Sequence, residues 1–132
     1  MYKIIVAGCG SMSSKWIEIA KTRSDCEIVA LVDINAEAAY NKIKKYSLSA
    51  KVYSNINDAL EKENADIVFD VTIPEVHFEI VTTALRAGCH VFGEKPMSDS
   101  LEKAEKCWLV RRKLTENILL CRTEGIYQAC LR

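Results

Sequence analysis

The sequence predicts an α/β fold: a single domain with one doubly wound parallel sheet of about six strands and helices on both faces. The first observation behind this is that short apolar, β-branched runs alternate with helical stretches from end to end of the chain. The second is that the first of these runs, residues 3–7, breaks directly into a glycine-rich turn. Such alternation builds parallel sheets through right-handed crossovers, so helices cover both faces.

The composition is that of an ordinary globular chain. Its 132 residues amount to one domain, with 49% hydrophobic and 27% charged residues. Eighteen basic and eighteen acidic residues cancel, so the chain has no electrostatic footprint for nucleic acid or an anionic membrane. No apolar run approaches the roughly 20 residues of a membrane span, and the N-terminus lacks the pattern of a signal peptide. We therefore expect a cytoplasmic protein with neither kind of partner.

The six cysteines are spaced for neither a metal site nor a disulfide framework. No two of them are two to four residues apart, and the chain has only two histidines. We therefore expect no bound metal and six reduced thiols, as in a cytosolic protein.

Residues 3–7 are predicted to form a strand buried on both faces, and a glycine turn follows it. Gly8, Gly10 and Ser13 have the spacing of the dinucleotide fingerprint, with Ser at the third glycine position. Gly8 permits the tight turn, Gly10 lets the backbone approach a pyrophosphate, and Ser13 is small enough for close packing of helix on strand. The helix that starts near Ser11 directs its N–H groups and positive dipole end at the same spot, which makes an anion site.

The next two elements place an acid where a Rossmann unit requires one. A helix over residues 14–22, with Trp16 on its sheet-facing side, precedes a strand over residues 27–32. That strand ends on Asp33, twenty-three residues after Gly10, where an acid binds the adenosine ribose hydroxyls. Asp33 also suits a helix cap or a turn, but the order of elements favours the ribose role. No Arg or Lys follows closely to neutralise a 2′-phosphate, so NAD is favoured over NADP.

The middle of the chain continues the alternation. A helix follows whose predicted inner stripe comprises Ala36, Ala39, Tyr40, Ile43 and Ser47. A strand over residues 51–53 leads to a short helix capped by either Ser54 or Asn55. The buried strand over residues 65–72 contains Asp70, a carboxylate that is either functional or hydrogen-bonded to nearby loop amides. We expect the second of these roles.

A helix with a regular apolar stripe follows this strand. It begins at Pro74, which cannot continue a strand but suits the first helical turn, and Gly88 ends it. His77 lies at the N-terminal end of the stripe. We expect it to be a packing residue with a hydrogen-bonding role and a neutral ring, because a helix N-terminus disfavours a positive charge.

The fifth predicted strand, residues 89–92, delivers Gly93, Glu94, Lys95 and Pro96 to the carboxyl end of the sheet. Open parallel sheets bind their ligands at that edge, so Lys95 is placed where substrate and nicotinamide meet. The alternative is an ordinary surface pair of Glu94 and Lys95, which contributes little.

A longer helix is predicted from Ser98 or Asp99 to about Leu114, and a sixth strand covers residues 117–121. The residues expected on the inner side of the helix are Leu101, Ala104, Cys107, Trp108 and Leu114.

Several of these motifs, taken in order, resemble the glucose-fructose oxidoreductase, inositol dehydrogenase and rhizopine catabolism (Gfo/Idh/MocA) family. They are the glycine turn, the acid after the second strand, the Pro-x-x-His of Pro74 and His77, the Ala-Leu-x-x-Gly of residues 84–88, and Glu94-Lys95-Pro96. The resemblance covers nearly the whole chain. It implies an NAD(P)-dependent oxidoreductase that acts on sugars, cyclitols or related polyols.

The resemblance also implies roles for individual residues. Gly8, Gly10, Ser11 and Met12 would lie against the pyrophosphate, and Asp33 against the adenosine ribose. Thr72, Pro74, His77 and Glu94 would line the nicotinamide half. Lys95, also counted among the cofactor-binding residues, would be the catalytic lysine that orients substrate and polarises the reacting oxygen.

Members of this family continue into a second domain that completes the substrate site. We expect residues 1–121 to form the NAD(P)-binding domain and residues 122–132 to be a tail leading toward such a domain. On that basis the isolated chain binds cofactor, lacks full activity and self-associates through apolar surface near its last strand. The alternatives are a stand-alone nucleotide-binding sensor and a domain similar to dihydrodipicolinate reductase, since residues 70–75 are similar to that family's fourth-strand region.

Overall fold

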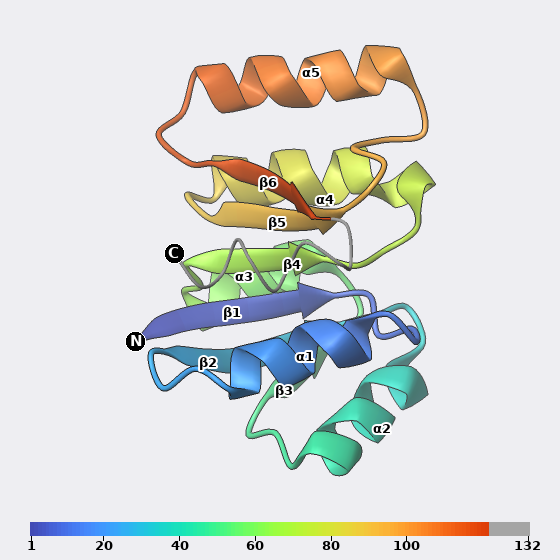
Figure 1. Cartoon of the computed structure of the whole chain (residues 1–132), viewed down its shortest axis with the longest axis vertical. Coiled ribbons are helices and arrows are strands. Elements are labelled where there is room, and N and C mark those ends of the chain that lie inside the picture. The colour runs from blue at the N-terminus through green and yellow to red at the C-terminus, as the bar shows by residue number, and fades with distance from the viewer. Residues whose placement is uncertain (122–132) are drawn as a thin grey trace.

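The computed structural model describes residues 1–121, which form one six-stranded parallel sheet with helices on both faces (Figure 1). The strands are β1 (Tyr2–Ala7), β2 (Cys26–Val32), β3 (Lys51–Tyr53), β4 (Ile67–Asp70), β5 (His90–Glu94) and β6 (Ile118–Cys121). The helices are α1 (Ser13–Lys21), α2 (Ala36–Tyr46), α3 (Ile56–Glu63), α4 (Pro74–Arg86) and α5 (Leu101–Arg112). The predicted doubly wound α/β fold is confirmed, and the predicted tail, residues 122–132, lies outside the described residues.

The strand order, β3-β2-β1-β4-β5-β6, reverses direction between β1 and β4. From β1 the chain moves outward to β2 and β3, and from β4 it moves outward to β5 and β6. Ala7 at the end of β1 pairs with Asp70 at the end of β4, so the two strands end side by side. Open α/β sheets bind ligands in the crevice outside the carboxyl ends of the strands at such a reversal. We call this side of the sheet the carboxyl edge.

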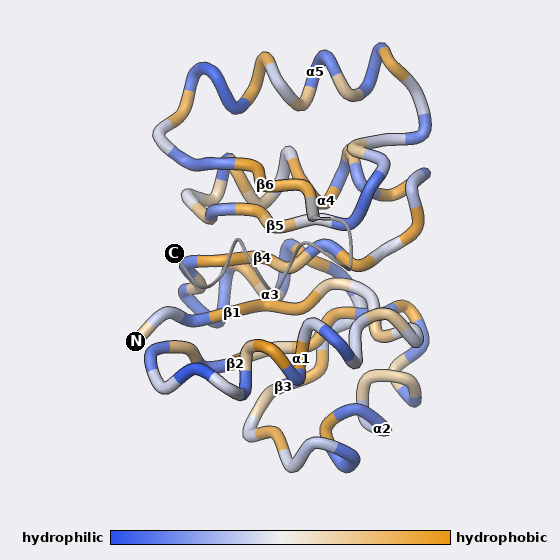
Figure 2. Tube along the Cα trace, viewed as in Figure 1, coloured by the Kyte–Doolittle hydropathy of each residue, from blue (hydrophilic) through white to orange (hydrophobic). Residues whose placement is uncertain are grey.

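Both faces of the sheet are buried, which explains why its central strands are apolar throughout. On β1, Ile5 and Ala7 belong to the core that also includes residues of α3 and α4. Ile4 and Val6 belong to the core that includes residues of α1 and α2. Successive strand side chains point to opposite faces, so a strand covered twice has no polar side. Figure 2 shows hydrophobic residues running along β1 and β4 in the middle of the sheet.

The structure settles which side chains cap two of the helices. Asn55 accepts from the backbone N–H of the third residue of α3, so the cap is Asn55 and not Ser54. Ser100 caps α5 in the same way, so the helix begins at Leu101, slightly later than the predicted start at Ser98 or Asp99. The Ser98 hydroxyl instead donates to the Asp99 carboxylate and is largely buried.

Two residues predicted on the inner stripe of α2 lie elsewhere. Tyr40 is 60% exposed, and Ser47 follows the helix in a left-handed conformation with φ of 51°. The buried aromatic residue is Tyr46, which shares a narrow stripe with Ala39. Because α2 lies beside the outer strands β2 and β3, only this stripe is covered and Tyr40 falls on its margin.

The predicted inner face of α5 is wrong for three of its five residues. Cys107 is fully buried, whereas Leu101, Trp108 and Leu114 are 76%, 50% and 37% exposed. Figure 1 shows α5 at the outer margin of the molecule beside α4. A helix covered from one side buries one narrow strip, so the apolar residues around the rest of α5 remain at the surface.

Within residues 1–121, no helix has the length and apolar character required to cross a bilayer.

We predict that Gly8→Ala lowers the free energy of unfolding by about 2 to 4 kcal/mol. Gly8 has a φ of +90°, and a Cβ there would lie 2.5 Å from the carbonyl oxygen of Val71. Urea unfolding measures the loss. Gly10→Ala is the matched control, because no atom lies within 4 Å of a Cβ at that position, and it should change stability by no more than about 0.5 kcal/mol. Equal effects of the two substitutions would contradict the steric explanation.

Candidate functional site

The glycine turn lies at the carboxyl edge, at the reversal between β1 and β4. Gly8 sits against the backbone of Val71, whereas a Cβ on Gly10 would meet nothing within 4 Å. Ser13 is fully buried, and its hydroxyl donates to the Gly10 carbonyl at 2.7 Å. The third fingerprint position therefore keeps helix and strand close and also holds the turn together. The open space at Gly10 is what close approach of a pyrophosphate to the backbone requires.

The N-terminus of α1 opens toward this turn without a side-chain cap. Met12 occupies the cap position and makes no capping hydrogen bond, so the helix end is not closed by its own side chains. An uncapped helix N-terminus presents N–H groups and the positive end of the dipole to an anion. Lys42 of α2 adds a cation, because its Nζ donates to the Ser14 hydroxyl at 2.6 Å. Lys42 was not predicted from the sequence, since nothing in the spacing ties α2 to this turn.

Asp33 connects the glycine turn to the end of β2. Its Oδ2 accepts from the backbone N–H of Cys9 at 2.8 Å, and its Oδ1 accepts from the N–H of Asn35 at 2.8 Å. The turn role considered for Asp33 is therefore observed. A carboxylate has about four lone-pair sites, so two remain for the hydroxyls of a ribose. The turn role and the ribose role are compatible.

The Cys9 thiol adds no negative charge to this turn. Burial first, and then the charge of Asp33, raise its pKa to about 12, and Lys42 acts in the opposite direction. Cys9 is 3% exposed and remains a neutral thiol at physiological pH. An anion at the turn therefore meets N–H dipoles and Lys42 without repulsion from a thiolate.

The end of β5 brings a second group of predicted residues to the carboxyl edge. Glu94 is the last residue of the strand, and its Oε1 accepts from the indole Nε1 of Trp16 at 2.8 Å. Lys95 follows and is exposed. In the part of the chain that the structure describes, its amine makes no hydrogen bond or ion pair, so the alternative of a surface Glu94–Lys95 pair is not observed.

Trp16 is the side chain that joins the two groups, although its position in the sequence predicts only a packing role. It is 1% exposed, stacks at a tilt on Phe69 of β4 with ring centroids 4.9 Å apart, and donates to Glu94 at the end of β5. The helix that carries the glycine turn is thereby tied to the strand that carries Lys95. No one-dimensional signal identifies such a contact, because 78 residues separate the partners.

Asp70 and His77 lie beneath the same edge and are almost completely buried. Asp70 accepts from the backbone N–H of Thr72 at 3.2 Å and from its hydroxyl at 2.5 Å, which is the loop-amide role expected for it. Burial raises the pKa of Asp70 above its ordinary value, while His77 and Thr72 act in the opposite direction. The hydroxyl of Thr72, predicted to line the nicotinamide half, is therefore already used by Asp70.

The His77 ring contacts the backbone rather than the open side of the edge. Its Nδ1 lies 2.8 Å from the Pro96 carbonyl oxygen, and its Nε2 lies 2.8 Å from the Thr72 carbonyl oxygen. Pro74 begins α4 at its first position, as predicted. Among the described residues, no group of three or more His, Cys, Asp or Glu side chains is arranged to hold a metal ion.

Comparison with known families now defines the class of protein. Residues 2–119 match a family described as "Oxidoreductase family, NAD-binding Rossmann fold", designated GFO_IDH_MocA. This match covers nearly all of the described chain. The chain belongs to this family, and it is an NAD-binding Rossmann domain of the oxidoreductase type.

Individual relatives agree with this assignment. The inositol 2-dehydrogenase/D-chiro-inositol 3-dehydrogenase of Lacticaseibacillus casei is 33% identical over 116 residues, which cover 87% of this chain and 33% of the relative. The 4-carboxy-2-hydroxymuconate-6-semialdehyde dehydrogenase of a Sphingobium species is 30% identical over 90% of this chain and 36% of its own length. The chain thus spans about a third of the length of these relatives.

Solved structures give the same fold. The myo-inositol dehydrogenase of Lactobacillus casei, in complex with NAD(H) and myo-inositol, superposes with a TM-score of 0.85 and is 30% identical, covering 91% of this chain and 36% of that one. The WlbA dehydrogenase from Chromobacterium violaceum, in complex with NADH and UDP-GlcNAcA, has a TM-score of 0.84 at 22% identity, over 91% of this chain and 34% of that one. At that identity the second likeness supports the fold alone.

We predict that Trp16 and Glu94 are energetically coupled by about 1 to 2 kcal/mol, because a hydrogen bond to an ionised acceptor is stronger than a neutral one. A double-mutant cycle of Trp16→Phe, Glu94→Ala and the double variant measures the coupling by urea unfolding. Phe retains an aromatic ring against Phe69 but has no N–H. Additivity of the two single effects within about 0.3 kcal/mol would contradict a stabilising contact.

Proposed function

We propose that this chain binds NAD(H) for hydride transfer to or from a sugar, cyclitol or related polyol. The observation that carries the proposal is that the glycine turn and Lys95 meet at one carboxyl edge, linked by the Trp16–Glu94 hydrogen bond at 2.8 Å. The inositol dehydrogenases among the relatives support the substrate class. The equal numbers of acidic and basic residues support the absence of nucleic-acid or anionic-membrane partners, and the six cysteines without a disulfide spacing support a cytoplasmic location.

The adenosine diphosphate half of the cofactor is assigned to the glycine turn and the end of β2. Gly8, Gly10, Ser11 and Met12, with the uncapped N-terminus of α1, would hold the pyrophosphate. Asp33 would accept hydrogen bonds from the ribose hydroxyls. Open space at Gly10 and the spare lone pairs of Asp33 support this assignment.

The nicotinamide half is assigned to the ends of β4 and β5. The residues that would surround it are Thr72, Pro74, His77 and Glu94. The His77 and Thr72 side chains are bonded within the protein, so they would act indirectly, by holding in place the backbone that contacts the nicotinamide. When bound, the nicotinamide ring accepts or supplies the hydride. Glu94 is held on one oxygen by Trp16, so its other oxygen remains for the cofactor.

Lys95 would be the catalytic residue on the substrate side. In the direction of reduction, an ammonium group next to the carbonyl oxygen stabilises the negative charge that develops on that oxygen as hydride is added to the carbon. Its amine is exposed and has no partner within residues 1–121, so it is available for this role. Polyol binding also requires groups that orient the remaining hydroxyls, and we propose that a second domain, reached through residues 122–132, supplies them.

We predict saturable binding of NADH to the 132-residue chain in a calorimetric titration, with weaker binding of NADPH. The reason for the difference is that Asp33 would face the added 2′-phosphate. Asp33→Ala and Gly10→Val should each weaken NADH binding about tenfold or more, through lost ribose hydrogen bonds and a blocked backbone approach. Tyr40→Ala, at an exposed position of α2, is the matched control that should not change it. A folded chain that binds neither nucleotide would refute the proposal.

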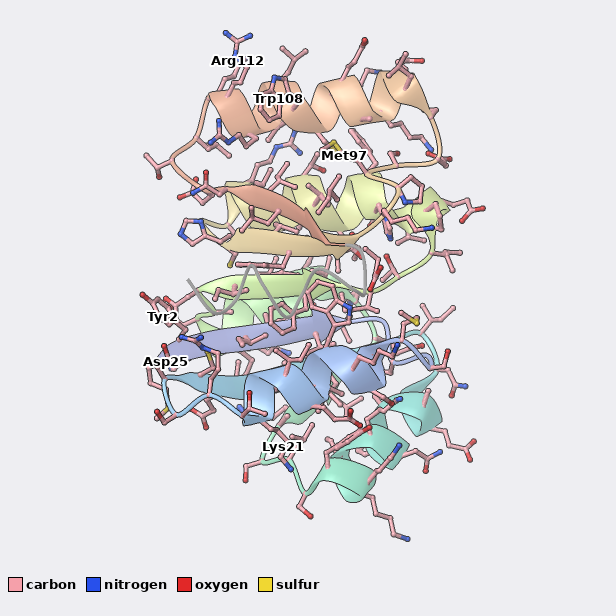
Figure 3. The ribbon with its side chains drawn as sticks, in the orientation of Figure 1. Tyr2, Lys21, Asp25, Met97, Trp108 and Arg112 are labelled. Carbon is pink, nitrogen blue, oxygen red and sulfur yellow. The ribbon has the colours of Figure 1, made fainter. Side chains whose placement is uncertain are left out.

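We further propose that the chain self-associates through α5 and β6. Met97, Leu101, Ala104, Glu105, Trp108 and Leu109 line a groove of about 500 Å³ on α5. Figure 3 shows Met97 beside α5 and Trp108 on the helix itself. Leu119 and Leu120 of the edge strand β6 are also 46% and 42% exposed. Lys103 pairs with Asp99, just before α5, and Lys106 pairs with Glu102 on the helix, so these two lysines add less like-charge repulsion between two copies.

Trp108→Glu should therefore shift the chain toward monomer, because it places a charge in the apolar groove. Light scattering across a concentration series measures the mass, and Tyr40→Glu, on the exposed side of α2, serves as the charge-matched control. A clean monomer of the unaltered chain at high concentration would refute self-association.

A further inference from the structure

The His77 ring is held between two groups that only accept hydrogen bonds. Its Nδ1 lies 2.8 Å from the Pro96 carbonyl oxygen and its Nε2 lies 2.8 Å from the Thr72 carbonyl oxygen. A neutral imidazole has one N–H donor and one bare nitrogen. One of the two contacts would then set a nitrogen lone pair against an oxygen lone pair, in a site where the side chain is 1% exposed. Such a buried, repulsive contact is costly.

Rotating the ring by 180° about its Cβ–Cγ bond does not remove the conflict. The rotation exchanges each nitrogen with a ring carbon, and these carbons would then lie near the positions now 2.8 Å from the carbonyl oxygens. Carbon–oxygen contacts of this kind normally lie at 3.3 to 3.6 Å. Both nitrogens therefore face the carbonyls, and two N–H donors are needed to satisfy them.

A countercharge for such a ring lies within reach. The Asp70 Oδ1 is 3.8 Å from the His77 Nε2, and both side chains are almost completely buried. The same Oδ1 accepts from the backbone N–H and hydroxyl of Thr72, while among the described residues the buried Oδ2 has no hydrogen-bond partner. Burial therefore disfavours the Asp70 charge, and a positive charge on His77 and the Thr72 contacts act to keep it. A buried cation is tolerated where a paired anion and hydrogen bonds replace its water.

Among the described residues, the Cys107 thiol of α5 is also in electrostatic contact with Asp70. Burial first, and then the charge of Asp70, raises the pKa of the Cys107 thiol, so it remains neutral. The N-terminus of α4 opposes a cation at His77, which is why the sequence predicts a neutral ring. A dipole at a helix end contributes less than a carboxylate at 3.8 Å and two charge-assisted hydrogen bonds.

We propose that His77 is protonated on both ring nitrogens at neutral pH, forms a buried ion pair with Asp70, and positions the backbone that carries Lys95. Pro96 directly follows Lys95, and Thr72 follows the end of β4. His77 itself belongs to the first turns of α4. One imidazolium thus joins three segments at the carboxyl edge. The charge state stands independently of NAD binding, whereas the positioning role rests on the proposed function.

Nitrogen-15 NMR of the histidine rings tests the charge state directly. At pH 7.5, we expect both His77 nitrogens to resonate as protonated nitrogens. His90 is an internal reference, since its Nδ1 accepts from the backbone N–H of Asn117 at 3.0 Å and is therefore unprotonated. His90→Gln assigns the two sets of signals, because the chain has only two histidines. One protonated and one bare nitrogen at His77 would overturn the proposal, with no variant of His77 required.

Asp70→Asn tests the ion pair and its consequence. The variant keeps an oxygen for Thr72 but removes the charge, so the His77 nitrogens should change to the pattern of a neutral ring. NADH binding should weaken threefold or more, while binding of ADP-ribose, which lacks nicotinamide, should stay within twofold. An unchanged His77 spectrum in a folded variant would overturn the ion pair, and equal losses for both ligands would overturn the positioning role. Failure of the unaltered chain to bind NADH would refute the proposed function and leave the spectrum to decide the charge state.

Discussion

The close approach of Gly8 to the backbone of Val71 is the constraint on which the rest of the site depends. A Cβ at Gly8 would lie 2.5 Å from the Val71 carbonyl oxygen, so the chain leaving β1 can pass the end of β4 only without a side chain. That passage sets the start of α1 and points its uncapped N-terminus at the carboxyl edge. It also places Trp16, one turn into α1, where its indole reaches β5.

Three polar contacts then join separate segments at this edge. Asp33 ties β2 to the glycine turn, Trp16 ties α1 to Glu94, and His77 ties α4 to the backbone beside Lys95. Each contact is wholly or partly shielded from water, so it stabilises one arrangement of the segments strongly. The two predicted halves of the dinucleotide site are therefore parts of one connected structure, which suits a ligand that must span both.

Much of the fold and part of the site follow from local patterns. Continuous apolar runs predicted the two-sided sheet, and the glycine spacing with Asp33 predicted the turn and its acid. The patterns failed where burial depends on neighbours. Tyr40 and Trp108 have helical spacing suited to a core, yet both are exposed because α2 and α5 lie at the margins of the sheet. Lys42 and the Trp16–Glu94 contact had no local signal, since their partners are distant in sequence.

The sequence by itself determined the class of the domain, the order of its elements and the residue types at the carboxyl edge, because periodicity and backbone requirements are local properties. Only the tertiary structure decided which of those side chains face the open edge and which are used within the protein. Among residues 1–121, Lys95 has no side-chain partner, whereas the Thr72 hydroxyl bonds to Asp70 and both His77 nitrogens face backbone carbonyls. These assignments depend on distances between β4, α4 and β5, and a linear pattern contains no information about such distances.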